Sequence, residues 1–355
     1  MKNNNWEKVK EDTLTGKTAA RIKKLYEKGE PIKVIIYNNL CVGDVLVMGS
    51  SILMLHQQYP GRFITDVACP HRSVYDHNPY IIKLNPNDPE TIHLWTTYPL
   101  VNRTNQRPVN FMEGYVDWFR TQFDIDLILD TNRPHIFLSK EEKVNNMIEQ
   151  QYGIKKFWVI NAGWKNDYTC KRWSIPYMQE VVNHFKNKIT FVQIGQTKPN
   201  VNHPPLDNVI NLIDKTNVRQ LMVLCYHAQG GIGPITCIQH MFAAYNKSGS
   251  EKSTTKDVSP YIVLHGAREP VFWTAYHNQK VFSNIGTLPC AANQACWKSR
   301  VVPLGDGDKK DKRLCELPMT DSDGRAIAKC MLNIKPKQVI EAIESYHDGG
   351  VLKYE

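Results

Sequence analysis

Apolar positions along the chain gather into short runs of strand length that alternate with longer runs of helical length. Residues 33–39 (KVIIYNN) form a β-rich run, the loop LCVGD follows, and residues 45–59 form an apolar helix. A second strand (ITDVAC) is predicted from Ile64. The order strand, loop, helix, strand is typical of a doubly wound α/β unit.

The second half of the chain repeats this alternation. Strands are predicted at 157–163, 189–195, 209–214 and 261–266, and helices at 175–187, 217–228, from Ile235 onward and at 336–347. Two α/β halves in series predict two Rossmann-like domains facing across a cleft, residues 1–150 and 151–355. Ligands of such sheets bind beyond the carboxyl ends of the strands, which is where we look for candidate chemistry.

The remaining segments are interpreted from composition and from turn and cap signals. Asn217 is the predicted N-cap of its helix, and Pro176 lies in the first turn of the helix at 175–187. Five further predictions follow in chain order. The first three are a charged helical segment at 1–30 anchored by Leu25 and Tyr26, loops and short strands that could line an acceptor site at 75–107, and a strand at 126–130. The other two are a helix with a capping-box start and a Gly stop at 139–153 and a mobile polar loop at 247–257.

The composition is that of a soluble globular protein with two domains of ordinary size: 355 residues, 42% hydrophobic and 22% charged. The net charge of +9 fits an anionic ligand, nucleic acid or an acidic surface, although the basic residues are scattered. The polar N-terminus and the lack of an apolar run of about 20 residues predict a cytoplasmic protein without a transmembrane segment. Its nine cysteines are then expected to be thiols or metal ligands.

Two loops carry the charge and the backbone N–H groups that a diphosphate needs. In residues 157–173 (FWVINAGWKNDYTCKRW) an apolar strand gives way to a polar loop that presents Lys171 and Arg172. In residues 233–244 (GPITCIQHMFAA) a Gly-Pro turn is predicted to open a helix, with Thr236 in its first turn and His240 one turn later. Helix N-termini and nearby cations bind phosphate groups, so these loops predict a nucleotide or nucleotide-sugar site.

Several residues of the predicted donor site also fit a purely structural role. Lys171 and Arg172 also fit a solvated pair beside Trp173, and His240 also fits a helix histidine packed against the sheet. Gly230 and Gly231 allow a close backbone approach, and Gln193 is a further candidate for the base or ribose. The predicted donor contacts are Gly43, Thr169, Lys171, Arg172, Gln196, Gly233, Pro234, Ile235, Thr236 and His240.

Asp44 is the candidate catalytic base. It follows Gly43 at the predicted turn from strand to helix, where a carboxylate can take the proton from an attacking hydroxyl. The alternative is an ordinary carboxylate at a helix N-terminus.

Four cysteines form a second candidate site. Cys290, Cys296, Cys315 and Cys330 lie in a turn-rich segment, with five, eighteen and fourteen intervening residues. Thiolates held by short loops suit a structural Zn or Fe ion, although these spacings fit no common zinc-finger pattern, and four free thiols are the alternative. Residues 305–311 (GDGDKKD) are predicted to be a polar turn rather than a Ca²⁺ loop, because the later bidentate Glu is missing.

Four segments together resemble glycosyltransferase family 9, which contains the lipopolysaccharide heptosyltransferases: VGDVLVMGSSILMLHQQYP, AGWKNDYTCKRWS, GPITCIQHMFAA and REPVFW. The resemblance covers most of residues 32–285. It implies the GT-B fold, an ADP-heptose-like nucleotide-sugar donor in the C-terminal half, and inverting transfer without a catalytic metal. It also implies that Asp44 is the base and that Lys171 contacts phosphate.

The chain departs from the family pattern ahead of Gly233. The family usually has a shorter gap between Gly-Pro and His, and an acidic or serine residue before the Gly, where this chain reads QGGIGP. One branch of the family, the autotransporter heptosyltransferases, carries a four-cysteine iron site in the region of Cys290 to Cys330.

Two other functions remain as alternatives, and a third is disfavoured. A glycosyltransferase acting on DNA or on a protein fits the positive charge, although no aromatic and basic stacking platform is evident. A non-catalytic nucleotide- or metal-binding protein fits the missing acidic residue. A nicotinamide oxidoreductase is disfavoured, because no G-x-G-x-x-G follows the first strand.

Overall fold

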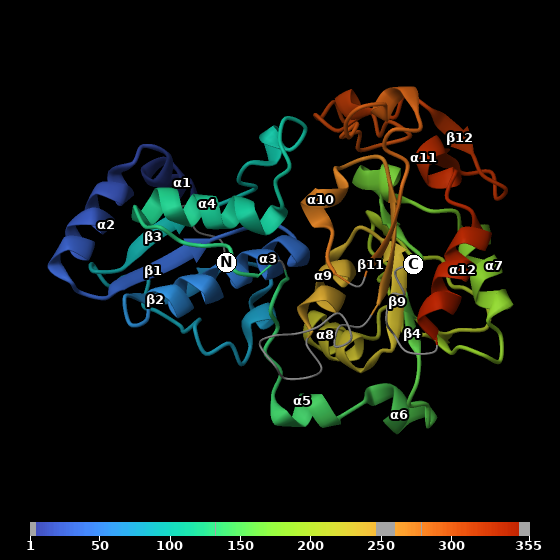
Figure 1. The fold of residues 1–355 in the computed structure, drawn as a ribbon, viewed down its shortest axis with the longest axis horizontal. Coiled ribbons are helices and arrows are strands. Elements are labelled where there is room, and N and C mark those ends of the chain that lie inside the picture. The colour runs from blue at the N-terminus through green and yellow to red at the C-terminus, as the bar shows by residue number, and fades with distance from the viewer. Residues whose placement is uncertain (1–4, 132, 246–259, 278, 348–355) are drawn as a thin grey trace. The chain divides into compact units, whose positions relative to one another are not determined.

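The computed structural model describes residues 5–131, 133–245, 260–277 and 279–347, and the loop predicted at 247–257 lies outside them. Contacts within the chain separate two compact units, Met1–Ser139 and Lys140–Glu355 (Figure 1). The sequence prediction placed this boundary at residue 150. Each unit is an α/β structure with its own parallel sheet.

The sheet of the first unit has three parallel strands in the order β2-β1-β3. Its strands are β1 (Ile32–Tyr37), β2 (Phe63–Ala68) and β3 (Ile92–Trp95). Helix α3 (Val42–Gln58) connects β1 to β2, and residues 45–55 are all buried. A helix that is apolar on all sides must be covered on all sides, and α3 accordingly packs against α4 (Phe111–Phe123) as well as β2.

The predicted N-terminal helical segment is confirmed as α1 (Asn5–Leu14) and α2 (Lys17–Lys28). Its buried apolar anchors are Val9 and Ile22, whereas Leu25 and Tyr26 are only half-buried. Helix α1 packs on β3 and α2 on β1, β3 and α4, which fixes this segment to the first sheet.

Two expectations for the first unit were incomplete or wrong. Helix α4 was not predicted, and residues 126–130 form no strand. Side chains, rather than a neighbouring strand, bond this backbone. The amide of Gln58 bonds both polar groups of Ile128, and the hydroxyl of Tyr59 donates to the carbonyl of Asp126. The apolar run DLILD therefore satisfies its backbone without a ladder.

The sheet of the second unit is fully parallel, with strand order β11-β10-β9-β4-β6-β8. Its strands are β4 (Trp158–Ile160), β6 (Phe191–Gln193), β8 (Ile210–Asn211), β9 (Gly230–Pro234), β10 (Tyr261–Gly266) and β11 (Gln279–Ser283). The strand order runs outward in both directions from β4 and β9. The carboxyl ends of these two strands therefore mark the topological switch point, where ligands of such sheets bind.

Helices and short elements complete the second unit. The longer helices are α7 (Ile175–His184), α8 (Val218–His227), α9 (Cys237–Ala244) and α12 (Pro336–His347). The short helices are α5 (Lys140–Val144), α6 (Met147–Tyr152), α10 (Val271–Thr274) and α11 (Lys329–Leu332). Two antiparallel pairs join β5 (Trp164–Lys165) to β7 (Val201–Asn202) and β12 (Pro318–Thr320) to β13 (Ala326–Ala328). The 3₁₀ turns are η1 (Arg72–Tyr75), η2 (Val101–Arg103), η3 (Asn166–Lys171), η5 (Pro289–Ala291) and η6 (Asp311–Arg313).

Caps explain where several helices begin and end. Asn217 caps α8 as predicted, accepting from the backbone N–H of Gln220 in a reciprocal capping box. The single helix predicted at 139–153 is two helices, because Asn146 caps the second one with its side chain. Gly153 ends α6 in the left-handed conformation that glycine adopts most easily.

The predicted Gly-Pro turn at residues 233–234 is instead the end of the buried strand β9. Glycine is needed at the start of this strand for close packing. A Cβ on Gly230 would lie 2.7 Å from the ring of Trp158, and one on Gly231 would lie 2.7 Å from the ring of Phe242. Helix α9 therefore starts only after Thr236, which is its N-cap.

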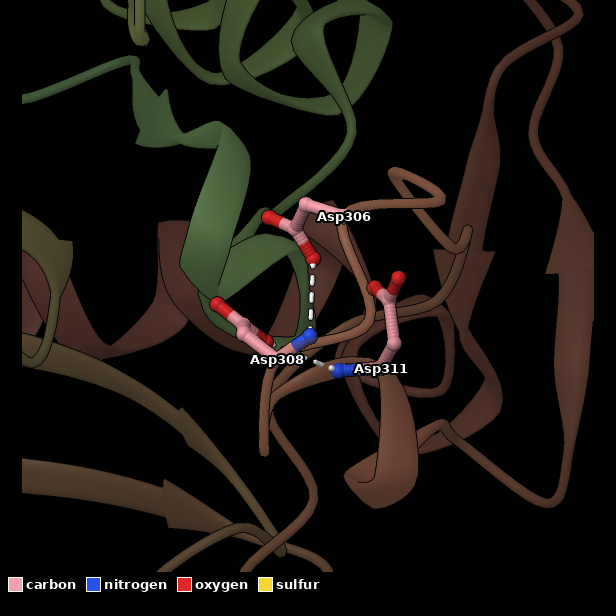
Figure 2. A group of neighbouring side chains, drawn as sticks. All are labelled: Asp306, Asp308 and Asp311. Carbon is pink, nitrogen blue, oxygen red and sulfur yellow. Dashed lines mark hydrogen bonds between the residues drawn. The ribbon is translucent and has the colours of Figure 1, made fainter.

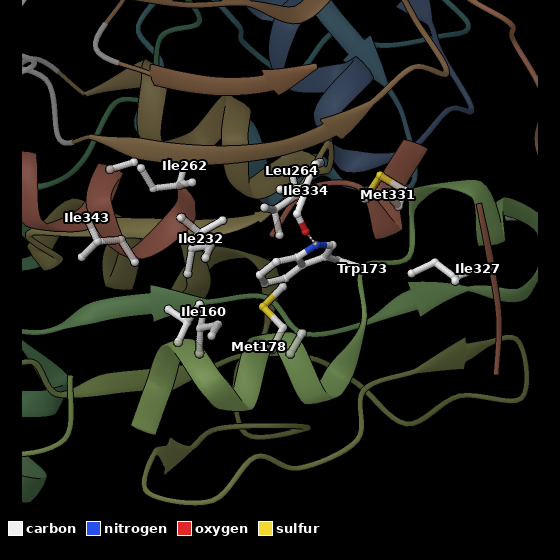
Figure 3. Packing of buried hydrophobic residues seen from close by; sticks show 14 of the residues in the cluster. Ile160, Trp173, Met178, Ile232, Ile262, Leu264, Ile327, Met331, Ile334 and Ile343 are labelled. Carbon is white, nitrogen blue, oxygen red and sulfur yellow. Dashed lines mark hydrogen bonds between the residues drawn. The ribbon is translucent and has the colours of Figure 1, made fainter. Parts of the chain in front are cut away.

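Trp173 lies in the core of the second unit (Figure 3). Its indole Nε1 donates to the carbonyl of Ile334 over 3.0 Å, and its ring belongs to the same buried cluster as Met178 and Leu264. Because α7 starts two residues later, this contact attaches the loop that carries Lys171 to the chain just before α12.

Candidate functional site

Asp44 lies in the first turn of α3, just past the carboxyl end of β1. Its Oδ2 accepts a hydrogen bond from the backbone N–H of Cys41 at 2.9 Å and another from the hydroxyl of Tyr98 at 3.1 Å. Gly43 precedes it as a buried residue of the same turn. The carboxylate thus stabilises the helix N-terminus, as the alternative interpretation proposed, and remains half-buried at the strand end.

Tyr98 was not identified from the sequence. It lies in the loop after β3, next to Pro99, whose carbonyl oxygen packs against Gly114 of α4. A Cβ on Gly114 would approach that oxygen to 2.5 Å, so glycine is needed for this loop position. Burial and the nearby Asp44 carboxylate raise the pKa of Tyr98, so its hydroxyl stays protonated and acts as a donor.

In the second unit, Lys171 ends the 3₁₀ turn η3 and reaches the start of α9. Its Nζ donates to the carbonyl of Ile235 over 3.3 Å and lies 3.2 Å from Oε2 of Glu269. Ile235 lies between β9 and the N-cap Thr236, whose hydroxyl accepts a hydrogen bond from Asn161 over 3.2 Å. The structure therefore brings Lys171 together with the segment from Gly233 to Thr236, as the two-loop pattern predicted.

Glu269 is the carboxylate shared by Lys171 and a second cation, Arg268. It follows β10, is buried, and pairs with both Lys171 and Arg268. Burial alone would raise the pKa of Glu269, but the charges of Lys171, Arg268 and His265 outweigh burial and lower it to about 2. Sequence reasoning used the segment REPVFW only as a family marker and did not identify Glu269 or Arg268 as site residues.

His240 lies inside α9 and is buried. Its Nδ1 is 2.7 Å from the hydroxyl of Tyr276, and burial lowers the pKa of His240 to about 4. It is therefore neutral at pH 7 and cannot supply positive charge to a phosphate. The contacts agree with the interpretation of His240 as a packed helix histidine.

The two glutamines predicted near the base or ribose have different surroundings. Gln196 follows β6 and is exposed, and its carbonyl oxygen and N–H lie near Nδ1 of His203. Gln193 is buried, and its side chain bonds the carbonyl of Pro204 and the N–H of Leu206. The amide of Gln193 thus holds a loop, and only Gln196 faces solvent.

Arg172 and Thr169, both predicted to contact phosphate, bond other groups of the protein. The guanidinium of Arg172 is buried, lies 2.6 Å from Oδ2 of Asp321, and donates to the carbonyls of Arg325 and Ala326. The hydroxyl of Thr169 accepts from the N–H of Val301. Arg172 therefore attaches η3 to the hairpin β12–β13, whereas the ammonium group of Lys171 lies at the start of α9.

All four predicted cysteines line one small cavity of about 10 Å³, together with a fifth, Cys170. Sequence spacing could not reveal Cys170, which lies 120 residues before Cys290 and directly before Lys171. A hydrogen bond from Cys170 lowers the pKa of Cys315 to about 7, and burial raises the pKa of Cys330 to about 12. Within the described residues, no three of the five sulfurs lie within 4.8 Å of one another.

The aspartates of residues 305–311 form a tighter group, in which Asp306, Asp308 and Asp311 converge (Figure 2). The buried guanidinium of Arg300 lies 3.1 Å from Asp306 and from Asp308, and it also bonds Asp311. A cation of the protein thus pairs with all three carboxylates. This agrees with the predicted polar turn.

Comparisons with known proteins address the fold. No protein-family model matches the chain, and a search of curated proteins finds no match. A glycosyltransferase family 9 structure from Veillonella parvula DSM 2008 has a TM-score of 0.60 and 12% identity, over 90% of this chain and 98% of that one. The E. coli ADP-heptose lipopolysaccharide heptosyltransferase II has a TM-score of 0.54 and 14% identity, over 89% of this chain and 98% of that one.

The iron-containing dodecameric glycosyltransferase TibC from enterotoxigenic E. coli H10407 is also similar, with a TM-score of 0.55 and 15% identity, over 90% of this chain and 79% of that one. These matches confirm the predicted fold: an α/β structure with parallel sheets like that of the GT-B heptosyltransferases. Separately, none of the helices in the described residues is both long enough and apolar enough to cross a membrane.

Proposed function

We propose that this protein is an inverting glycosyltransferase of the heptosyltransferase kind, which moves a sugar from a nucleoside diphospho-sugar to a hydroxyl acceptor. The observation that carries the proposal is the position of Lys171. Its ammonium group lies at the start of α9, at the switch point of a fully parallel sheet. A fixed cation beside a helix N-terminus at this edge suits a diphosphate. We take ADP-heptose as the donor, because solved proteins of this fold include an ADP-heptose heptosyltransferase.

In the proposed reaction, Asp44 takes the proton of the acceptor hydroxyl as its oxygen attacks the anomeric carbon. The bond from that carbon to the diphosphate breaks, and the electron pair leaves with the nucleoside diphosphate. Lys171 and the first N–H groups of α9 neutralise the charge that builds on the leaving group. Inversion follows from a single attack opposite to the leaving group. In this reaction protein groups alone neutralise the leaving group, and no catalytic metal is required.

We also propose that the cysteine cavity holds a structural Zn or Fe ion. Five thiols around one cavity the size of a single atom are a soft donor set of the kind these metals prefer. Metal–sulfur bonds of about 2.3 Å put tetrahedral sulfurs ~3.8 Å apart, so metal binding would draw four of the sulfurs closer together. The similar fold of the iron-containing TibC supports the proposal.

A thermal-shift screen tests the donor site. Wild type and Lys171→Ala are heated with ADP, UDP, GDP and CDP, each with and without its sugar. A ligand at a hundred times its Kd adds about 2.7 kcal/mol of stability, which is several degrees of Tm. We expect one diphosphate to stabilise the wild type and to lose most of this effect in Lys171→Ala.

A transfer assay with Asp44→Asn tests the base. We expect this variant to keep the nucleotide-induced shift and to lose sugar transfer. Wild type that binds a donor but turns over with no acceptor would instead indicate a non-catalytic binding protein. Binding to DNA that weakens steeply with salt would indicate a nucleic-acid acceptor.

A further inference from the structure

Lys171 alone is a weak match for the charge of a diphosphate. The sequence placed a second cation beside it at Arg172, but that guanidinium is buried against Asp321 in the hairpin β12–β13. If the proposed donor site is correct, a second cation should come from another segment at the same sheet edge. The segment after β10 supplies one, Arg268.

Arg268 and Lys171 share a carboxylate. Nη1 of Arg268 bonds Oε2 of Glu269, and Nζ of Lys171 lies 3.2 Å from the same oxygen. The three groups together carry one net positive charge. Glu269 thereby fixes the two cations next to each other, although they lie on segments almost a hundred residues apart.

Two aromatic rings lie close to the guanidinium of Arg268. Its Cζ lies 5.0 Å from the ring centre of Tyr168 and 5.2 Å from that of Trp297. Cation–π contacts of this kind stabilise a desolvated arginine.

The backbone at Trp297 is strained in support of this arrangement. Trp297 has a φ of 51°, a left-handed conformation that is rare for a bulky side chain. Its N–H donates to the carbonyl of Arg268 over 2.7 Å, and the N–H of the preceding Cys296 donates to Ala267. Such strain costs roughly 1–3 kcal/mol and is concentrated at functional sites. The cysteine-bearing segment therefore also positions Arg268.

One donor of this buried guanidinium has no acceptor. Arg268 is 7% exposed, and its Nε is buried with no hydrogen-bond partner among the described residues. An unsatisfied donor on a charged group is costly, and an anionic oxygen in the guanidinium plane would satisfy it. A phosphate oxygen is such an acceptor, whereas the sugar offers only neutral hydroxyls.

We propose that Arg268 is a second cation of the donor site and binds an oxygen of the diphosphate through Nε, with Glu269 as the positioning residue for Arg268 and Lys171. The inference rests on the proposed donor site and adds a residue that neither the sequence pattern nor the resemblance assigned.

Calorimetric titration with ADP, inorganic pyrophosphate and adenosine tests this inference. Arg268→Lys keeps the charge but loses the planar donor edge. We expect it to weaken ADP and pyrophosphate about 10- to 100-fold, the loss of one charge-assisted hydrogen bond, and to leave adenosine binding unchanged. Trp297→Leu removes one ring and no charge, and we expect a smaller loss with the same ligand pattern.

Arg219→Lys is the matched control. Arg219 is another mostly buried arginine of this unit and pairs with Glu142 at 2.6 Å. Its replacement by lysine therefore measures how much stability is lost when such an ion pair is disturbed. We expect it to lower Tm and to leave all three affinities unchanged. Unchanged ADP and pyrophosphate affinities in Arg268→Lys would overturn the inference while the donor site stands. Equal losses for adenosine would show a merely structural role. Wild type that binds no nucleoside diphosphate would overturn the proposed function as well.

Discussion

Tyr98 donates its hydroxyl hydrogen to Oδ2 of Asp44 over 3.1 Å, although the two residues lie 54 positions apart in the first unit. The same oxygen accepts the backbone N–H of Cys41. Two donors on one carboxylate oxygen orient the group and favour its ionised form. If Asp44 is the base, Tyr98 controls both its direction and the pH at which it is ready to accept a proton.

Replacing Tyr98 by Phe removes this hydrogen bond and keeps the ring against Phe111. Because the ionised carboxylate loses a donor, we expect the acid limb of the pH–rate profile to move to higher pH by about one unit, with donor affinity unchanged. The profile of kcat/KM against pH measures this. Tyr59→Phe is a control, since its hydroxyl donates to the carbonyl of Asp126. An identical profile in Tyr98→Phe and wild type would show that Tyr98 does not act on the carboxylate.

Replacing Arg172 is expected to lower the stability of the protein rather than its affinity for the donor. Arg172→Ala leaves the carboxylate of Asp321, whose side chain is fully buried, without its cation. Breaking a buried ion pair from one side costs about 3–5 kcal/mol, which urea unfolding measures. We expect the folded fraction of Arg172→Ala to bind ADP as the wild type does. If Arg172→Ala instead loses ADP affinity with little change in stability, Arg172 is a donor-binding residue.

Metal content tests the cysteine cavity. The purified protein should contain about one Zn or Fe per chain by elemental analysis, and chelation under mildly unfolding conditions should lower its Tm. Cys296→Ser and Cys315→Ser should lose the metal, and Cys170→Ser shows whether the fifth thiol is a ligand. Cys41→Ser, an exposed thiol in the other unit, should keep it. A wild type that takes up neither metal when refolded with each would identify the cysteines as free thiols.

The buried His240 should make the protein less stable in mild acid. Its pKa falls from 6.5 to about 4 on folding, mainly through burial, so the unfolded chain binds a proton between these values that the folded chain does not. Stability is therefore complete above pH 6.5 and is lost as pH falls, by about 1.4 kcal/mol per unit.

Urea unfolding at pH 7.5 and pH 5 measures this effect. Between these values the wild type should lose about 2 kcal/mol more than His240→Gln, which has no titrating ring at this position. Other buried histidines titrate in both proteins and cancel in the difference. Equal losses in the two proteins would mean that His240 is protonated in the folded state.

Local sequence patterns predicted the elements whose causes are local. The strand at residues 33–39 and the apolar helix after it appear as β1 and α3, and Asn217 caps α8 through its own neighbours. The apolar run at residues 126–130 was misjudged, because side chains of Gln58 and Tyr59 satisfy its backbone. The Gly-Pro turn at residues 233–234 was misjudged because it ends the buried strand β9, where a Cβ on Gly233 would lie 2.6 Å from the hydroxyl of Tyr261.

The sequence by itself determined that the chain is an α/β protein, and that Asp44 and Lys171 follow strand ends. Strand and helix periodicity are set by neighbours a few residues apart, so one chain is enough to read them. Only the tertiary structure decided which side chains meet. Arg172 pairs with Asp321, 149 positions away, Arg268 joins Lys171 through Glu269, and Cys170 joins the distant cysteines. Such partners depend on burial and on charges that meet only after the sheet has folded, and no local pattern records them.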